Sequence, residues 1–448
     1  MFVSRGSRGG AALAACAALL FTVAGCGTDD AEQAGKPSPV RLYGTDGNMG
    51  NSFGGEFKDQ SGVLAGMKGT TPLTPLSESF KTRLRSVYPK LDDVVYAGET
   101  YDAVVISALA AQLAGASTPA QIAAQINGVT TMGTPCDVVS DCFRLARAGT
   151  DIEYRGVSLK RGGFTDAGEP STATFATLHF DANNQINDGK TEFVGAGDET
   201  ATTTKLPPAG RKQRSGARST RPLKIGGLLP MSGDLALLYP PMAAGALLGI
   251  REVNAAGGVL GQPVQWIEGD DGTNAEVAKA TVRKHIEAGV HVMIGAGASD
   301  ISRAVLPEVV EAGVILFSPC NTDAGLSTIQ DDGLFFRTAP SDLLQGRALA
   351  DVILRDGSQK IAIVARKDSY GEGLQSNVRA ELEKAGIGGD QLKLLSYEPP
   401  ADASTPLEFS AGAAEIKAFR ADAVLLIGFG ESAQVIKALI SAGVALRH

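Results

Sequence analysis

The sequence predicts an α/β protein with two doubly wound lobes, each built on a parallel sheet. From residue 223 onward, short apolar runs that suit buried strands alternate with longer runs that suit helices. This alternation is typical of parallel sheets covered by helices on both faces. The chain has 448 residues, enough for two or three domains. Apolar residues make up 44% of it and charged residues 20%, so a folded core is expected.

The alternation can be followed one element at a time. The first strand is expected at 224–229, and the next helix opens at Pro240-Pro241 and stops at Gly257-Gly258. Further strands are expected at 264–268, 290–295, 314–318, 360–365 and 423–427, and further helices at 275–288, 301–311, 374–384 and 432–441. Two sheets in series therefore predict two lobes.

The last helix stops at Gly443, where a doubly wound sheet would need another strand. At the other end, residues 40–43 form a strand-like run with no helix before it, and Gly44-Thr45-Asp46-Gly47 follows as a turn. The missing strand and the surplus strand match if the end of the chain is joined to its beginning.

The N-terminus has the features of an export signal. Arg5 and Arg8 are positive, residues 11–24 are apolar, and small residues precede Cys26. Val23-Ala24-Gly25-Cys26 resembles a bacterial lipobox, which predicts a lipoprotein signal over 1–26 and a lipid on Cys26. The alternative is a plain signal peptide with a chance cysteine. No later stretch is apolar for long enough to span a bilayer.

Export changes how the other cysteines are interpreted, because disulfides persist outside the cytoplasm. Five residues separate Cys136 from Cys142, so a local disulfide is expected, with two free thiols as the alternative. Cys320 is interpreted as a small buried apolar residue.

A change in composition at 200–222 separates residues 27–199 from residues 223–448. This segment is rich in Thr, Pro, Ser, Gly, Lys and Arg, with few apolar residues. Such composition predicts a flexible basic linker. Contact of its basic run with anionic lipid is the less favoured alternative.

Several spaced motifs in residues 223–448 resemble one family. They are IGGLLPMSGDLA, GIREVNAAGGVLGQPVQWIEGDD, GVHVMIGAGAS, FSPCNTDAGL and KDSYGEG. Together they resemble the N-terminal half of bacterial type I periplasmic solute-binding proteins of the leucine/isoleucine/valine-binding group, which serve ABC importers. VRLYGTDG, GTTPL and YAGETYDAVVISALA, between residue 40 and about residue 193, resemble the C-terminal half. The order is inverted, so the chain resembles a circular permutation; two unrelated domains are the alternative.

The resemblance implies two lobes joined by three crossovers. The first lobe would comprise about 223–340 with 76–150. The second would comprise 341–448 with 38–75 and 151–195. The helix expected at 101–113 would pack on the first lobe.

The resemblance also implies a ligand site between the lobes, because family members that bind amino acids hold the α-carboxylate and α-ammonium there. The implied ligand-binding residues are Ser299, Asn321 and Thr322 in the first lobe, Tyr370 and Asp46 in the second, Phe429 as an aromatic wall, and Tyr239 as a cover. Ser299 would bind the carboxylate and Asp46 the ammonium. Ser299 as a helix cap, and Asp46 and Asn321 as turn residues, remain the structural alternatives.

The expected function is capture of a small polar solute, an amino acid, by closure of the lobes on the outer face of the cell membrane, for an ABC permease. The alternative is a ligand-sensing or regulatory module of the same fold acting on a signalling or cell-wall partner. No enzyme activity, cofactor or metal is expected: Gly295-Ala296-Gly297 lacks the rest of a dinucleotide fingerprint, and the 4 histidines are scattered. The net charge of −8 argues against a nucleic-acid partner.

Overall fold

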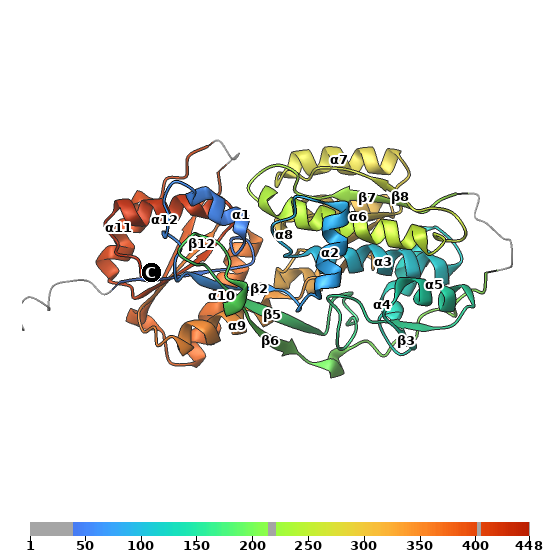
Figure 1. Cartoon of the computed structure of the whole chain (residues 1–448), viewed down its shortest axis with the longest axis horizontal. Helices are drawn as coiled ribbons and strands as arrows, with labels where there is room; N and C mark the ends of the chain where they lie inside the picture. The colour runs from blue at the N-terminus through green and yellow to red at the C-terminus, as the bar shows by residue number, and fades with distance from the viewer. Residues whose placement is uncertain (1–38, 214–220, 401–404, 448) are drawn as a thin grey trace, which may run out of the picture. The chain divides into compact units, whose positions relative to one another are not determined.

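The computed structural model describes residues 39–213, 221–400 and 405–447, which form two α/β lobes (Figure 1). The expected signal at 1–26, with Cys26, lies outside these described residues. Both lobes contain segments from early and late in the chain, as the colours of Figure 1 show. The lobes therefore do not correspond to the two halves of the sequence.

The first lobe is built on a five-stranded parallel sheet with the order β11-β10-β9-β7-β8. These strands are β7 (Lys224–Leu228), β8 (Gln265–Ile267), β9 (Val292–Gly295), β10 (Ile315–Ser318) and β11 (Phe335–Arg337). The helices between them are α6 (Tyr239–Ala255), α7 (Ala275–Glu287) and α8 (Ser299–Glu311). The order reverses at β7, as in a doubly wound sheet.

The early part of the chain adds more structure to this lobe: α2 (Glu78–Val87), α3 (Ala97–Ala114), α4 (Pro119–Val129), α5 (Val139–Arg147), and the small sheet of β3 (Thr134–Cys136) and β4 (Ile152–Tyr154). A disulfide joins Cys136 to Cys142, with Cα atoms 5.5 Å apart. Every residue of α3 is buried, and this helix packs on α6. Gly245 permits that approach, because a Cβ there would lie 2.3 Å from the Ala97 carbonyl oxygen.

None of the described helices alone is long and apolar enough to cross a membrane. The bent pair of α3 and α4 passes that test jointly, by length and composition only. Burial of α3 within the first lobe explains its apolar composition without a membrane.

The second lobe contains a seven-stranded sheet with the order β13-β12-β14-β1-β2-β5-β6. Its strands are β1 (Arg41–Gly44), β2 (Lys68–Pro72), β5 (Thr172–His179), β6 (Glu192–Gly197), β12 (Ile361–Arg366), β13 (Leu392–Tyr397) and β14 (Ala423–Ile427). The first five strands in this order, from β13 at the edge to β2, are parallel. Strands β5 and β6 continue the sheet beyond β2 with antiparallel pairing. Strand β1 lies between β14 and β2, with Arg41 opposite Ala423 and Tyr43 opposite Leu425.

The helices of this lobe are α1 (Asn51–Gly54), α9 (Asp342–Arg355), α10 (Ser369–Lys384), α11 (Ser410–Phe419) and α12 (Ser432–Ser441). All residues of β12 and β14 are buried, as expected of central parallel strands with both faces covered. Short 3-10 turns occur in the two lobes at Gly55–Phe57, Asp188–Lys190, Glu199–Ala201, Ala236–Leu238, Ala324–Thr328 and Gly389–Gln391.

The chain passes between the lobes four times in the described residues: between β2 and α2, between β4 and β5, between β6 and Thr203, and between β11 and α9. The sequence prediction that 151–195 belongs to the second lobe is wrong for its first part. Strand β4 pairs with β3, and the Phe164 ring packs against Phe317 of β10 with centroids 6.1 Å apart. The second crossover therefore lies near Pro170, because the segment before it completes the first-lobe core.

The prediction of a flexible linker over 200–222 is also wrong in part, since residues 200–213 are bound to the protein surface. The backbone N–H of Arg211 donates to the Leu113 carbonyl (2.8 Å), and that of Gln213 donates to the Arg147 carbonyl (2.9 Å). Both carbonyls lie in the last turn of a helix, where backbone acceptors lack partners within the helix. Residues 214–220 lie outside the described part of the chain.

Candidate functional site

The expected ligand residues follow the carboxyl ends of strands in both sheets. Asp46 comes after β1, Ser299 after β9, Thr322 after β10, and Phe429 after β14. Loops at the carboxyl ends of parallel strands are the usual position of ligand sites in α/β proteins. The exposed fraction of each of these four residues is 4% or less.

Asp46 is a buried carboxylate held by three donors from three elements. Its Oδ2 accepts a hydrogen bond from the Tyr96 hydroxyl (2.8 Å), and its Oδ1 accepts from Gln345 Nε2 (2.7 Å) and the Tyr370 hydroxyl (2.9 Å). Burial raises the pKa of Asp46 above its ordinary value, and the three donors oppose that rise. No described Lys, Arg or His forms an ion pair with it.

Gly47 allows the Asp46 loop to approach the end of β14. A Cβ at position 47 would lie 2.5 Å from the Gly428 carbonyl oxygen and 2.7 Å from the Phe429 ring. The side chain of Asn48 fixes the same turn by accepting from Thr45 N (2.9 Å) and donating to the Leu426 carbonyl (3.1 Å). The beginning and end of the described chain thus jointly position the Asp46 carboxylate.

Asp342 is a second buried carboxylate, which the sequence analysis missed. It begins α9, just after the chain crosses from β11 into the second lobe, and its backbone N–H donates to the Thr322 carbonyl (2.7 Å). Neither side-chain oxygen accepts a hydrogen bond from a described residue. Burial and the nearby charge of Asp46 raise the pKa of Asp342 well above its ordinary value. In the sequence, an Asp just after Pro340-Ser341 indicates only an acidic first turn of a helix.

Ser299 and the loop after β10 form the first-lobe side of the site. Ser299 is the first residue of α8, whose N-cap, Ala298, provides no side-chain cap. Its hydroxyl accepts from Asp323 N (3.3 Å), which joins the two loops. Asn321 donates from Nδ2 to the carbonyls of Ala296 (3.1 Å) and Gly297 (2.9 Å), while its buried Oδ1 has no partner among the described residues.

Aromatic rings form another wall. Tyr370 and Phe429 stack with centroids 5.4 Å apart and an interplanar angle of 22°. The Arg366 guanidinium carbon lies 3.9 Å from the centroid of the Phe429 ring. The Tyr370 hydroxyl is also 2.8 Å from Thr45 Oγ1, next to Asp46. An apolar surface therefore adjoins the carboxylate.

Tyr239 does not join this group, contrary to the sequence prediction. It begins α6, is half-buried, and lines a separate small cavity together with Met231 and Trp266. Neighbouring Leu238 is buried in the first-lobe core. The prediction failed because the turn before α6 sets the direction of consecutive side chains, and composition alone does not define that turn.

The two lobes are in contact around the site. Tyr96, which precedes α3 in the first lobe, donates to Asp46 of the second (2.8 Å). Gly430 N of the second lobe donates to the Asp234 carbonyl of the first (3.2 Å), and the Asp234 carboxylate is 3.9 Å from Arg366. Burial of the site residues at 4% exposure or less thus reflects a closed arrangement of the lobes.

Comparison with known proteins gives matches to about half of the chain. A leucine-, isoleucine-, valine-, threonine-, and alanine-binding protein of Pseudomonas aeruginosa is 31% identical over 180 residues, covering 40% of this chain and 48% of that protein. A Leu/Ile/Val-binding protein homologue of Brucella melitensis is 26% identical over 210 residues, which cover 46% of this chain and 54% of that protein. The chain thus spans about half the length of the curated relatives it matches.

A crystal structure of a branched-chain amino acid transporter substrate binding protein from Streptococcus pneumoniae, in complex with isoleucine, aligns with 50% of this chain and 63% of its own, at 22% identity and a TM-score of 0.44. The family model described as periplasmic binding protein matches residues 222–448, just over half of the chain. On the extent of that match, the chain belongs to the periplasmic binding protein family.

Proposed function

We propose that this chain is an extracytoplasmic solute-binding lipoprotein that captures an amino acid between its lobes and delivers it to an ABC importer. The observation that carries this proposal is a pair of buried carboxylates, Asp46 and Asp342, that no described cation neutralises by an ion pair. The first lobe contributes the hydroxyl groups of the loops after β9 and β10 and the N-terminus of α8. This polarity suits a small zwitterion.

The ammonium end of the solute would lie between Asp46 and Asp342. An isolated buried carboxylate is costly, and such groups either retain a proton or take a cationic partner. The raised pKa values of both groups reflect that cost in the protein alone. A bound ammonium would supply the missing positive charge, and the hydroxyls of Tyr96 and Tyr370 already hold Asp46 in place.

The carboxylate end would lie at Ser299 and Thr322. Helix α8 is 13 residues long, and its N-cap residue, Ala298, makes no side-chain cap hydrogen bond. The first backbone N–H groups of a helix lack partners within it and carry partial positive charge, so they bind carboxylates well. The Ser299 hydroxyl would add a side-chain donor at this end, and Thr322 would add another from the loop that Asp323 N joins to Ser299.

The solute's side chain would contact the Tyr370–Phe429 stack. An apolar aromatic wall suits an aliphatic side chain, and the relatives named above are described as binding leucine, isoleucine and valine. The orphan Oδ1 of Asn321 would limit this space and would accept a hydrogen bond from a polar side chain.

Two features of the gene product accompany this proposal. Cys26 would carry the lipid that keeps the protein at the outer face of the membrane, where an importer is accessible. The chain order would be a circular permutation of the family order, with the former ends joined through 200–222. Pairing of β1 with β14, and the backbone bond from Val40 N to the Ala445 carbonyl (2.7 Å), support this reading.

Isothermal titration of the purified chain from residue 27 with single amino acids tests the central proposal. One or more amino acids should bind, and derivatives lacking either charge should bind more weakly: an N-acetyl form has no ammonium, and a carboxamide has no carboxylate. Binding at a hundred times Kd should also stabilise the protein by about 2.7 kcal/mol in a thermal scan. Absence of binding by all amino acids, or equal affinity for the N-acetyl form, would refute the proposal.

A further inference from the structure

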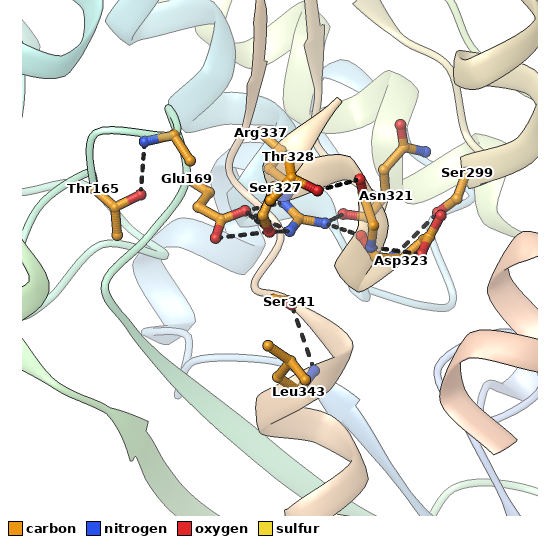
Figure 2. A network of polar contacts seen from close by, with 12 residues as sticks. Thr165, Glu169, Ser299, Asn321, Asp323, Ser327, Thr328, Arg337, Ser341 and Leu343 are labelled. Carbon is orange, nitrogen blue, oxygen red and sulfur yellow. Dashed lines mark hydrogen bonds and ion pairs between the residues drawn. The ribbon is translucent and has the colours of Figure 1, made fainter. Parts of the chain in front are cut away.

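The largest fully buried side chain in the described part of the protein is a charged one, Arg337, at the end of β11. It lies between Glu169 on one side and Asn321 and Asp323 on the other (Figure 2). A buried guanidinium is costly unless its charge is balanced and its donors are used. The environment of Arg337 meets both conditions, so its contacts indicate what it holds in place.

One edge of the guanidinium binds backbone groups of the loop after β10, which contains Asn321 and Asp323 and is called the ligand loop below. Nη1 donates to the carbonyls of Asn321 (3.2 Å) and Asp323 (2.9 Å), the two residues that flank Thr322. The Asp323 carboxylate does not take part, since it is paired with Arg303 (2.6 Å). Arg337 therefore fixes the orientation of two peptide groups, and with them the direction in which Thr322 faces.

The other edge of the guanidinium is fixed by Glu169. Nε donates to Glu169 Oε2 (2.8 Å), and Nη2 contacts the same oxygen. Ser327 joins this pair, with its hydroxyl 2.8 Å from Nη2 and within 3.0 Å of both Glu169 oxygens. Glu169 is the one acid that forms an ion pair with Arg337 among the described residues. Because guanidinium is planar and rigid, fixing one edge also fixes the other.

The loop held in this way also includes the hydrogen bond to Ser299. Asp323 N lies along the backbone between the Asn321 and Asp323 carbonyls that Arg337 binds, and it donates to Ser299 Oγ (3.3 Å). The groups assigned to the solute's carboxylate, Ser299 and Thr322, thus depend on one loop conformation. Asp46 and its donors belong to other segments, and among the described residues no hydrogen bond or ion pair joins them to Arg337.

We infer that Arg337 is a positioning residue for the carboxylate end of the ligand site, and that Glu169 acts through it. The inference rests on the proposed function, because it requires a ligand carboxylate at Ser299 and Thr322. A buried arginine can support the fold as a whole, or it can align one end of a ligand site. The inference assigns the second role to Arg337.

Glu169→Gln tests this, because it keeps the shape of the side chain and removes the charge. The probes are L-leucine, L-isoleucine, L-valine, L-threonine and L-alanine; the tightest binder is compared with its own carboxamide. Glu169→Gln should weaken binding of the amino acid by roughly tenfold to a hundredfold, the loss expected when a charge-assisted hydrogen bond is misaligned. Binding of the carboxamide should change by less than about threefold, since Asp46 and the donors that hold it lie on other segments.

Glu252→Gln is the matched control. Glu252 also pairs with a first-lobe arginine, Arg83 (2.5 Å), and accepts from the Tyr101 hydroxyl (2.6 Å), but it lies on α6 away from the ligand loop. The Glu252→Gln substitution should lower the melting temperature without changing the ratio of amino-acid affinity to carboxamide affinity. Ser327→Ala, a milder change beside Arg337, should shift that ratio in the same direction as Glu169→Gln.

The outcomes separate the inference from the proposed function. If the parent protein binds an amino acid more tightly than its carboxamide and Glu169→Gln lowers both affinities equally, the inference is overturned and the proposed function stands. If the parent binds none of the five amino acids, the proposed function fails for these probes and the inference fails with it. A selective loss of the amino acid supports both.

Discussion

Replacement of Asp46 by asparagine should separate ligand affinity from stability. Asparagine keeps the shape of the side chain, and its Oδ1 can still accept from Gln345 and Tyr370. Its Nδ2 would face the Tyr96 hydroxyl, which can rotate and accept a hydrogen bond. The change therefore removes the negative charge and leaves the surrounding network in place.

The magnitude follows from burial and from the neighbouring carboxylate. Removing one partner of a buried ion pair costs about 3–5 kcal/mol. Asp342 remains to share the ammonium, so the lower end applies, about 3 kcal/mol or roughly a hundredfold in Kd. Stability without ligand should move the other way: because burial raises the pKa of Asp46, its ionised form opposes folding at neutral pH, and asparagine removes that cost.

Isothermal titration with a bound amino acid, together with thermal scans without ligand, measures both effects. Asp102→Asn is the control, since Asp102 is also buried and accepts from a tyrosine, Tyr154 (2.8 Å), but on α3 away from the site. The control should leave Kd unchanged, and it should lower the melting temperature because the asparagine Nδ2 would face a backbone N–H of Val157 or Ser158, which cannot accept a hydrogen bond. Unchanged affinity in Asp46→Asn would refute the placement of the ammonium.

Three further predictions concern pH, membrane attachment and chain order. Burial raises the pKa of Asp271 to about 7, so the folded protein takes up a proton between about pH 4 and 7, and this group's contribution to stability falls as pH rises across that range. In urea unfolding, the free energy of unfolding of Asp271→Asn relative to that of the parent should rise by about 3–4 kcal/mol between pH 4 and pH 7.5. Parallel pH profiles of the two proteins would contradict this. Cys26→Ala should release the protein from the membrane fraction or block its processing, and normal processing with full retention would rule out the lipid anchor. A reordered chain, 223–447 followed by 39–199, should fold and bind with the parent's affinity, whereas a folded product without binding would contradict the permutation.

The fold was predictable where periodicity and chain order carry the signal. The strand expected at 423–427 and the helix expected at 432–441 match β14 and α12. The surplus strand at 40–43 was expected to fill the gap beside them, and β1 does pair with β14. A buried parallel strand is a short apolar run, which sequence alone can indicate.

Two parts could not be read from composition. Residues 200–213 are polar and rich in turn formers, but they are fixed by backbone bonds to the ends of α3 and α5, and such bonds depend on no particular side chain. Asp342 is an ordinary acid in a first helical turn until the crossover brings it beside Asp46. In both cases, contacts between distant segments determine the role of the residue.

The central position of β1 has a consequence for how the protein reaches its native state. During synthesis or export, the first strand of the second lobe emerges long before β14, its neighbour in the sheet. Contacts between distant parts of a chain form slowly, because a long loop must close before any stabilising contact is gained. The second lobe therefore cannot complete its sheet until nearly the whole chain is available. Under the proposed export route, this delay would keep the chain unfolded and competent for transport.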